Sequence, residues 1–570
     1  MLRRRLLVST IGALCLASPI LAQRALSGQM ANLAPDQTVD VIIRYKPGAG
    51  AASRARSAGH ALRLNHDLWL LGSQALTIKA GELAALARDP DVEAIVPDRP
   101  ITSTATSMVP DYGWLTVLGL STPTPTSTIA YDGSGIGVAV IDSGINSDND
   151  LSSVKGGGSR VVYADCFIPN EKKDPSDRYG HGTHVAGIVG GNGKQSSGNN
   201  LKYEIRGIAP NVNLINLRVL DENGTGRDSY VVAAIQEAIS LQKQYNIRVI
   251  NLSLGRPVYE TYLWDPLCQA VEQAWQAGIV VVVAAGNDGR DNSAGTNGYG
   301  TIAAPGNDPY VITVGAMNTG GTLTRSDDKI ASYSSKGPSL IDHFAKPDLV
   351  APGNRIFSLQ APNQYLHKNF PANAVPKYVY TTQTASSAPD YYQLSGTSMA
   401  TPMVSGTVAL MLQKDPTLTP DQVKARLMKT AQKLPPVLSF ATDPVTGIVY
   451  TSENDLFTVG AGYLDAQAAL ANTDRASAPA LSPAVTADGH GGVFLVTGAN
   501  AVWGTGAVWG TNAVWGTNAV WGTNAVWGTG AVWGTGFVSG TNAVWGTNAV
   551  WGTSSWSDAE ALPITINGEQ

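Results

Sequence analysis

The chain has 570 residues, a formal net charge of -5 and 43% hydrophobic residues. This length gives room for several domains and a large buried core. Acidic and basic residues nearly balance and no long basic run occurs, so we expect neither a nucleic-acid partner nor binding to an anionic membrane.

The first 22 residues have the layout of a secretory signal peptide. Three arginines precede an apolar run that ends at the small residue Ala22. The run is short and broken by Pro19, which favours a cleaved peptide over a membrane anchor. We therefore expect a secreted, extracellular protein. Its mature chain would keep Cys166 and Cys268, and the sequence leaves their pairing open.

A small α+β unit is predicted next, over residues 36–100. Its first stretch, VDVIIRY, alternates apolar and polar residues as a half-buried strand does. Strands mixed with a helix over so short a segment indicate an α+β unit. A stretch rich in Ser, Thr and Pro follows at 101–130 and is predicted to be linker or surface chain. The predicted elements are strands at 39–45, 75–80 and 92–96 and a helix at 81–89.

Beyond residue 130 the pattern changes to that of an α/β fold. Runs that are apolar on both faces are typical of buried parallel strands. Helical stretches lie between them, which predicts a parallel sheet covered on both faces. Active groups gather at the carboxyl ends of such strands, where Asp142 and Asn287 stand. The predicted strands are 135–145, 213–220, 248–254, 278–287 and 310–316, and the predicted helices 228–244 and 265–278.

Two histidines in YGHGTHVAG, His181 and His184, raise the question of a metal site. A zinc helix favours H-E-x-x-H, but here the spacing is three and no Glu intervenes. Ser398, in LSGTSMATP, begins a long apolar run and taken alone could be a helix N-cap. Asp142, His181 and Ser398 nevertheless follow the chain order of one class of catalytic triad.

The residues around these three positions resemble those of subtilisin-type serine proteases, the subtilases. Seven motifs arrive in the family's order over residues 130–475. The resemblance implies an α/β fold with a subtilisin-like parallel sheet flanked by helices. It also implies peptide-bond hydrolysis through an acyl-enzyme, on protein or peptide substrates. The motifs are VAVIDSGI (138–145), GHGTHVAG (180–187), VINLSLG (249–255), VVAAGNDG (282–289), ASYSSKGP (331–338), KPDLVAPG (346–353) and SGTSMATP (395–402).

The resemblance also implies a role for each site residue. Ser398 is expected to be the nucleophile, His181 its general base, and Asp142 the group that holds the imidazole. The side-chain amide of Asn287 and the N–H of Ser398 are expected to bind the oxyanion. His184 is expected to pack or to hydrogen-bond nearby, without a metal. The expected substrate-binding residues, which resemble backbone edges of the family, are Ser253, Leu254, Gly255, Ala285 and Gly286.

The chain departs from the family's usual pattern in four places. Met403 replaces a structural histidine, and Ser405 stands nearby. Arg256 follows SLG where another glycine is usual, which bears on the substrate groove. Residues 354–393 form a long connection, expected to be an ordered surface excursion near the site.

No cofactor is expected for catalysis. Asp150 aligns with a calcium ligand of the family, and calcium prefers carboxylate and carbonyl oxygens. The partner loop lacks the family's Asn-rich pattern, so a structural calcium ion and a solvated loop acid both stay open for Asp150.

The predicted domain order is a signal peptide (1–22), an inhibitory propeptide (23–105) and a subtilisin-like catalytic domain (106–475). The prediction of a propeptide comes from the resemblance to the family. The expected partners of the catalytic domain therefore include the chain's own propeptide. Self-cleavage is expected within or near residues 101–110. The remaining predicted segments are a linker (476–497), Trp-rich hexapeptide repeats (498–556) and a C-terminal tail (557–570).

The repeats carry variants of AVWGTG, with tryptophan at nearly every sixth position and no charged side chain. In an extended chain this period places Ala, Trp and Thr on one face. A ladder of outward rings suits sugar rings or a cell-surface polymer; a low-complexity spacer without a ligand is the alternative. The alternative function is accordingly a surface-adhesion or binding protein that uses these repeats, with the protease domain as a scaffold or self-processor.

Overall fold

The computed structural model describes residues 33–46, 48–68, 73–97, 114–120, 131–153, 158–168, 171, 174–197, 202–382, 388–487, 493–496, 564 and 566–569. The predicted signal peptide, the expected cleavage segment and the predicted repeats lie outside them. The chain divides into two compact units, Met1–Met108 (unit 1) and Val109–Gln570 (unit 2).

Unit 1 is an antiparallel sheet in the order β2-β3-β1-β4, with short helices. The three predicted strands and the predicted helical stretch are present. The elements α2 and β2 were not predicted, because α2 has no apolar stripe and buries only Ser53 and Ser57. The elements are β1 (Thr38–Tyr45), α2 (Ala51–Gly59), β2 (Ala61–Leu68), β3 (Ser73–Lys79), η3 (Ala80–Glu82), α3 (Leu83–Leu86) and β4 (Val92–Pro97).

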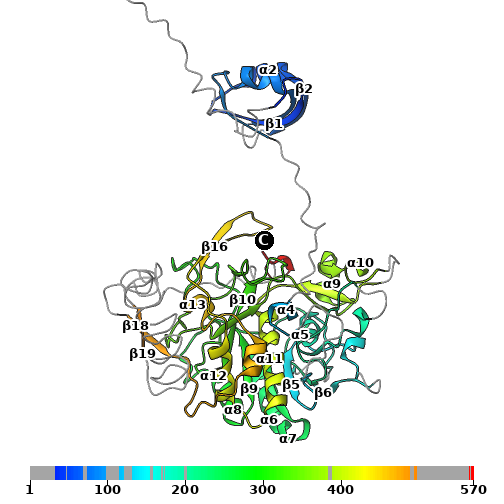
Figure 1. Ribbon diagram of the computed structural model, residues 1–570, viewed down its shortest axis with the longest axis vertical. Coiled ribbons are helices and arrows are strands. Elements are labelled where there is room, and N and C mark those ends of the chain that lie inside the picture. Colours follow the sequence, from blue (N-terminus) through cyan, green and yellow to red (C-terminus); the bar gives the residue numbers. More distant parts are fainter. Residues whose placement is uncertain are drawn as a thin grey trace, which may run out of the picture. The chain divides into compact units, whose positions relative to one another are not determined.

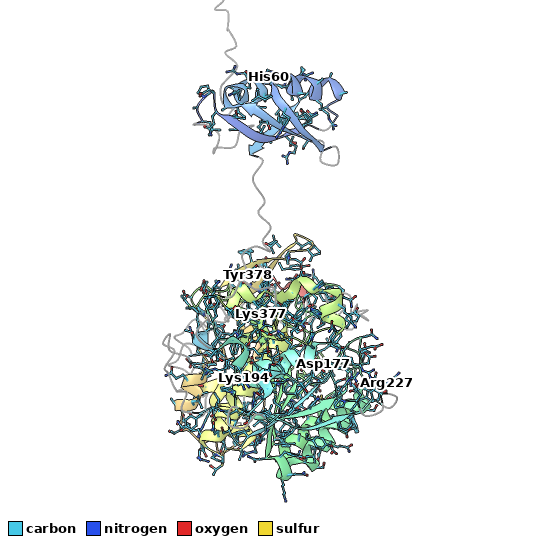
Figure 2. All side chains as sticks on the ribbon, turned by 90° about the vertical axis from the view of Figure 1, so that its right-hand side faces the viewer. His60, Asp177, Lys194, Arg227, Lys377 and Tyr378 are labelled. Atoms are coloured by element: carbon cyan, nitrogen blue, oxygen red, sulfur yellow. The ribbon has the colours of Figure 1, made fainter. Side chains whose placement is uncertain are left out.

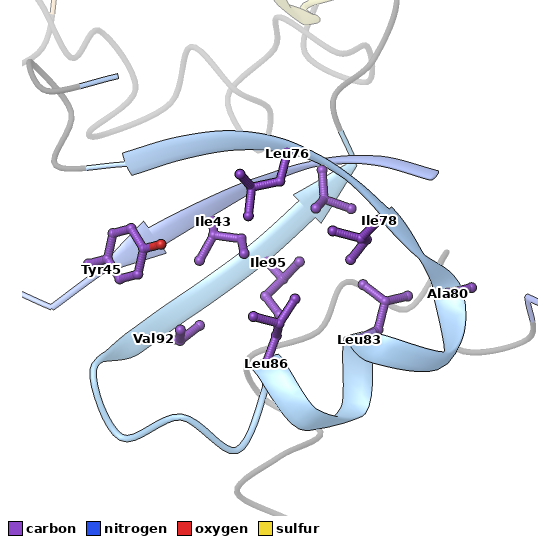
Figure 3. Close-up of a cluster of buried hydrophobic side chains, with 10 residues drawn as sticks. Ile43, Tyr45, Leu76, Ile78, Ala80, Leu83, Leu86, Val92 and Ile95 are labelled. Carbon is purple, nitrogen blue, oxygen red and sulfur yellow. The ribbon is translucent and has the colours of Figure 1, made fainter. Parts of the chain in front are cut away.

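The core of unit 1 lies between the sheet and α3 (Figure 3). Alternate residues of β1, among them Val41 and Ile43, are fully buried, as the alternating sequence predicted. Leu76 and Ile95 from the neighbouring strands and Leu86 from α3 belong to the same cluster.

Unit 2 is built on an eight-stranded sheet in the order β11-β10-β9-β8-β5-β7-β6, with β12 beside β10. Every pairing is parallel except that of β11 with β10. All residues of β5, β9 and β12 are buried, so both faces of the sheet are covered. The strands are β5 (Gly137–Asp142), β6 (Val161–Cys166), β7 (Asn213–Arg218), β8 (Ile247–Leu252), β9 (Val280–Ala284), β10 (Ile312–Asn318), β11 (Lys329–Ile330) and β12 (Leu349–Pro352).

Two pairs of helices cover this sheet (Figure 1). Helices α5 (His181–Gly190) and α11 (Thr397–Lys414) pack on each other and on the strands, and α6 (Asp228–Ser240) and α8 (Pro266–Gln276) form the second pair. The fold is therefore the predicted α/β class. The predicted helix at 228–244 ends at Ser240 and is followed by the separate α7 (Gln242–Tyr245).

Residues 354–393 contain a further small sheet, in the order β13-β15-β14. The prediction of a surface excursion is wrong for β13 and for most of β15, because β13 is wholly buried and three of the four residues of β15 are. Tyr380, Tyr391 and Tyr392 are buried and form hydrogen bonds there, whereas Tyr378 is exposed. The elements are β13 (Ile356–Leu359), α9 (Tyr365–Asn369), η7 (Pro371–Asn373), β14 (Ala374–Val375), α10 (Lys377–Tyr380) and β15 (Tyr391–Leu394).

The remaining elements of unit 2 lie around this framework. Within the described part of the chain, no helix is long and apolar enough to cross a membrane. The elements are α4 (Trp114–Val117), η5 (Asn149–Leu151), η6 (Lys194–Ser196), α12 (Pro420–Thr430), β16 (Leu438–Thr442), β17 (Val449–Glu453), α13 (Leu456–Val459), α14 (Ala466–Ala471), β18 (Ala484–Ala487) and β19 (Val493–Val496).

Candidate active site

Asp142 and His181 meet where β5 ends and α5 begins. Asp142 is the last residue of β5, and His181 is the first residue of α5. Nδ1 of His181 lies 2.8 Å from Oδ1 of Asp142, and both side chains are buried. The strand end and the helix start thus bring together two residues 39 positions apart in the chain.

The start of α5 is held by a buried carboxylate that was not predicted from the sequence. Asp177 accepts hydrogen bonds from the N–H groups of Gly180 (2.7 Å) and Thr183 (2.8 Å) and from the hydroxyl of Ser143 (2.8 Å). Asp177, which is labelled in Figure 2, is completely buried. It satisfies helix N–H groups that have no partner within the helix, and so it fixes the position of His181.

Opposing effects act on the pKa of His181. Burial lowers this pKa, but the carboxylates of Asp142 and Asp177 outweigh burial and hold it above the ordinary value. Imidazolium next to a carboxylate is favoured because the charges are opposite. His181 is therefore a stronger base than a free histidine.

Ser398 lies in the first turn of α11, opposite the end of β8. Its hydroxyl donates to the backbone oxygen of Ser253 (3.1 Å), and the hydroxyl of Ser253 donates to the backbone oxygen of Ser398 (2.8 Å). The second bond has a clear cause. Pro402, four residues on, has no N–H to donate to the Ser398 carbonyl, so Ser253 supplies the missing donor.

The amide of Asn287 has a defined orientation. Its Oδ1 accepts from the N–H (2.9 Å) and the hydroxyl (3.1 Å) of Thr397, which leaves Nδ2 as the group turned away from Thr397. Gly396 stands beside it with a φ of +145°. A β-carbon on Gly396 would lie 3.2 Å from Nδ2 of Asn287 and 3.6 Å from the nitrogen of Ser398. The two expected oxyanion donors thus border the same space.

A hydrogen-bond chain runs beneath Ser398 through residues of two elements. Ser405 donates to Asn251 (2.8 Å), and Asn251 donates to the hydroxyl of Ser253 (3.0 Å). All three side chains are buried. Ser405, noted as a departure from the family pattern, therefore braces β8 against α11, and Met403 is fully buried beside it.

His184 is a structural residue, as predicted. Its Nε2 lies 3.1 Å from the carbonyl oxygen of Ile356 and 3.0 Å from that of Tyr392. Burial, helped by the charge of His181, lowers the pKa of His184 to about 3. The ring is therefore neutral at ordinary pH and ties α5 to β13 and β15.

The expected substrate-binding residues fall into two groups. Ser253 offers its hydroxyl and carbonyl to Ser398, while Leu254 is half-buried and Gly255 exposed. Ala285 and Gly286 differ, because the N–H and the carbonyl of each are already bonded within unit 2. The backbone groups of Ala285 and Gly286 are thus engaged within unit 2, and substrate binding at these two residues stays a prediction.

The charge of Arg256 is paired with two carboxylates of unit 2. Its guanidinium bonds to Asp228, at the start of α6, and to Asp265, the N-cap of α8. Its backbone forms an antiparallel bridge with Ala304. Arg256, in the place where glycine is usual, thus links the starts of α6 and α8 to the chain that follows SLG.

Asp150 does not have the surroundings of a calcium ligand. One of its carboxylate oxygens accepts from the N–H of Gln195 and the other from the hydroxyl of Tyr391, each at 2.7 Å. Burial raises its pKa to about 6. Among the described residues, no group of three or more His, Cys, Asp or Glu side chains could hold a metal ion. A carboxylate engaged by two protein donors does not fit calcium.

The two described cysteines are free thiols. Cys166 ends β6 and Cys268 lies in α8, and both are buried. Burial raises the pKa of each thiol. The pairing that the sequence left open is thus absent from the structure.

Comparison with known proteins gives the class of this fold and site. Residues 133–462 match the sequence profile of the subtilase family. The chain is 41% identical to serine protease AprX of Bacillus subtilis (strain 168) over 310 residues, which are 53% of this chain and 62% of that protein. It is 35% identical to subtilisin E of the same strain over 364 residues, 64% of this chain and 76% of the relative. Alkaline protease of Alkalihalobacillus alcalophilus is 30% identical over 373 residues, 65% of this chain and 77% of that protein.

The fold and these relatives define the class of a serine endopeptidase that acts on proteins or peptides. The match covers more than half of the chain, and the chain belongs to the subtilase family.

Proposed function

We propose that this chain is an active, secreted serine endopeptidase that is made as a precursor and processes itself. One observation supports the catalytic assignment above the others. The amide nitrogen of Asn287 and the backbone nitrogen of Ser398 border the same space beside Gly396. Two converging donors next to a serine nucleophile are what an acyl-transfer intermediate needs.

In the proposed mechanism the Ser398 hydroxyl turns from Ser253 to His181 and loses its proton to the imidazole as its oxygen attacks the scissile carbonyl. The carbonyl oxygen gains negative charge, which Asn287 and the N–H of Ser398 stabilise. His181 then gives the proton to the leaving amine, and an acyl-enzyme on Ser398 remains. Water repeats the sequence and releases the acid. Asp142 stabilises the imidazolium throughout.

Fluorophosphonate labelling tests this assignment directly. The reagent should modify Ser398 in the purified protein, and peptide mapping should locate the adduct there. Ser398→Ala should abolish labelling and cleavage of a short peptide. If wild-type protein that is folded by circular dichroism remains unlabelled, unit 2 is a scaffold and the endopeptidase proposal is wrong.

Secretion and self-processing rest on the sequence. The signal-like start supports export, and the compact unit 1 ahead of unit 2 supports a propeptide that is an α+β unit of its own. In that scheme unit 1 is a partner of unit 2 until the chain between them is cut near residues 101–110.

Expression of Ser398→Ala tests self-processing. The variant should accumulate as a precursor that contains unit 1, whereas wild-type protein separates into its two parts. Mixing the variant with active wild-type enzyme distinguishes cleavage within one chain from cleavage between chains. Normal trimming of the variant in the absence of any other protease would rule out self-cleavage.

A further inference from the structure

In the segment 564–569, which follows the repeats in the chain, the structure describes residue 564 and residues 566–569, and these pack into unit 2. Ile564, Ile566, Gly568 and Glu569 are buried. The sequence predicted only a tail beyond the repeats for these residues. Their burial places them among the elements of unit 2 instead (Figure 1, the red end of the chain).

The side chain of Glu569 has no exposed surface, and it bonds to two parts of the chain. It accepts from the N–H of Ser332 (3.0 Å) and from the Ser332 hydroxyl, and it pairs with Nη2 of Arg290 at 3.1 Å. The side chain of Arg290 is itself only 4% exposed. A buried carboxylate is tolerated when ionic and hydrogen-bonding partners surround it.

Both partners of Glu569 belong to the stretches of chain that hold Asn287. Gly289 donates its N–H to Tyr333 (2.8 Å), and Ser335 donates its N–H to Gly286 (3.0 Å). Backbone hydrogen bonds thus join the stretches 286–290 and 332–335 both before and after Asn287. Glu569 bonds to one residue in each stretch, Ser332 and Arg290, and so it adds a further link between the two stretches.

The backbone of the segment reaches the approach to Ser398. Asn354 both donates to the carbonyl of Glu569 (3.0 Å) and accepts from its N–H (2.9 Å). The next residue, Arg355, donates its N–H to the hydroxyl of Ser395 (2.9 Å), three positions before Ser398. The segment is therefore linked to both stretches that carry the expected oxyanion donors.

Gly568 allows this close approach. Its φ is +62°, and a β-carbon there would lie 2.5 Å from the hydroxyl oxygen of Ser395 and 2.6 Å from Oδ1 of Asn354. These distances are far shorter than van der Waals contact. A side chain at Gly568 would consequently push the segment away from Ser395 and Asn354.

We infer that segment 564–569 is a positioning element of the active site. Through Glu569 it holds the stretch 286–290, which contains Asn287, and through Asn354 it holds the chain that leads to Ser398. Both are thereby kept in the geometry that binds the oxyanion. This inference rests on the proposed function. Displacements of about half an ångström already weaken a preorganised site. Loss of the segment should therefore reduce the rate of the chemical step more than it reduces substrate binding.

The experiment compares three variants of the full chain, Gly568→Ala, Glu569→Ala and Glu569→Gln. Each is titrated with a fluorophosphonate to count active sites, and kcat and KM are measured per titrated site on a short peptide amide. Gly568→Ala and Glu569→Ala should lower kcat about tenfold, which is ~1.4 kcal/mol, with KM nearly unchanged. Glu569→Gln, which keeps the shape, should lose less. Gly135→Ala is the matched control, because Gly135 also has a positive φ (+82°) but has open space around it.

A second measurement asks whether the segment acts through Asn287. Residues that act as one unit are non-additive, so Gly568→Ala should have little further effect on kcat once Asn287→Ala is present. A full tenfold loss in that background overturns the inference. So does an unchanged kcat per titrated site in Gly568→Ala and Glu569→Ala, even if their melting temperatures fall, because the segment is then only structural. A wild-type protein that does not label overturns the proposed function instead.

Discussion

At the scale of single residues, the site depends as much on a missing side chain as on those present. Gly396 has a φ of +145°, and its absent β-carbon leaves open the space between Asn287 and the N–H of Ser398. Thr397, the next residue, turns the Asn287 amide so that its nitrogen remains available. Gly396 thus leaves space for the expected oxyanion, and Thr397 sets the direction in which the Asn287 amide points.

Gly396→Ala should therefore reduce kcat by about 10²–10³, the effect of losing one oxyanion donor in a subtilisin, and change KM little. The control is Gly447→Ala, since Gly447 has a φ of +70° and open space around it. Steady-state kinetics on a short peptide amide provides the measurement. A Gly396→Ala enzyme with normal kcat would show that the oxyanion lies elsewhere.

His181 should give activity an acid limb with a midpoint above the ordinary histidine value of about 6.5. Its pKa is raised, and only the neutral ring can accept the Ser398 proton, so kcat/KM should rise with pH through that pKa. The stability that the charged ring contributes has the opposite sense, being complete below about 6.5 and lost as pH rises through the folded-state pKa. The rate of fluorophosphonate labelling against pH measures the midpoint independently of substrate. A midpoint at or below 6.5 contradicts this account.

At the scale of secondary structure, α5 is joined to its neighbours by His184. The ring meets the carbonyls of Ile356 in β13 and Tyr392 in β15, and the hydroxyl of Ser358 donates back to the His184 carbonyl (2.7 Å). The helix that begins with His181 is thereby fixed against the small sheet of residues 356–394. Two histidines one turn apart consequently have opposite pKa shifts and different tasks.

The lowered pKa of His184 should appear as acid sensitivity of folding. The unfolded chain binds a proton at about pH 6.5, but the folded chain does so only near 3, so this contribution to stability is present above 6.5 and is lost as pH falls from there toward 3. We expect Ser398→Ala/His184→Gln to be less stable than Ser398→Ala at pH 7 by about 1–3 kcal/mol, with a shallower decline below pH 6.5. Urea unfolding at several pH values measures both quantities. Parallel declines would exclude His184 as the cause.

The sequence predicts this site unevenly, for physical reasons. Motifs around Asp142, His181 and Ser398 mark strand ends and helix starts, where the fold itself brings side chains together. Asp177 has no comparable pattern, because its role appears only when its carboxylate meets N–H groups across a turn. Likewise, apolar runs predicted the buried strands of unit 2, whereas the engaged backbone of Ala285 depends on pairing with chain far along the sequence.

At the scale of the whole molecule, the segment 564–569 was beyond prediction from sequence. No local pattern indicates that chain beyond a repetitive stretch returns to the active site, since the contacts join Glu569 to Arg290, 279 positions away. The hydrogen bonds that reveal it are long-range, and only the folded structure brings their partners together.

Deletion of residues 498–556 separates the repeats from this segment. Because residues 557–570 remain, cleavage of a short peptide should be nearly unchanged, while retention on insoluble polysaccharide or on cells should weaken if the tryptophans bind there. Deletion of 498–570 is the comparison and should lower kcat in addition. Equal retention of the first deletion and the wild type would leave the repeats as a spacer. Loss of folding in the first deletion would show that the catalytic domain needs the repeats in order to fold.

The free thiols of Cys166 and Cys268 have a consequence for the enzyme's lifetime. Neither described cysteine forms a disulfide within unit 2. An enzyme molecule that partly unfolds therefore has no such bond to limit further unfolding. In a solution of an endopeptidase an opened copy is also a substrate, and cleavage makes the opening irreversible. The working life of the preparation is then set by how rarely the sheet opens and by how concentrated the enzyme is. A thiol reductant should leave that lifetime unaltered, whereas dilution should extend it.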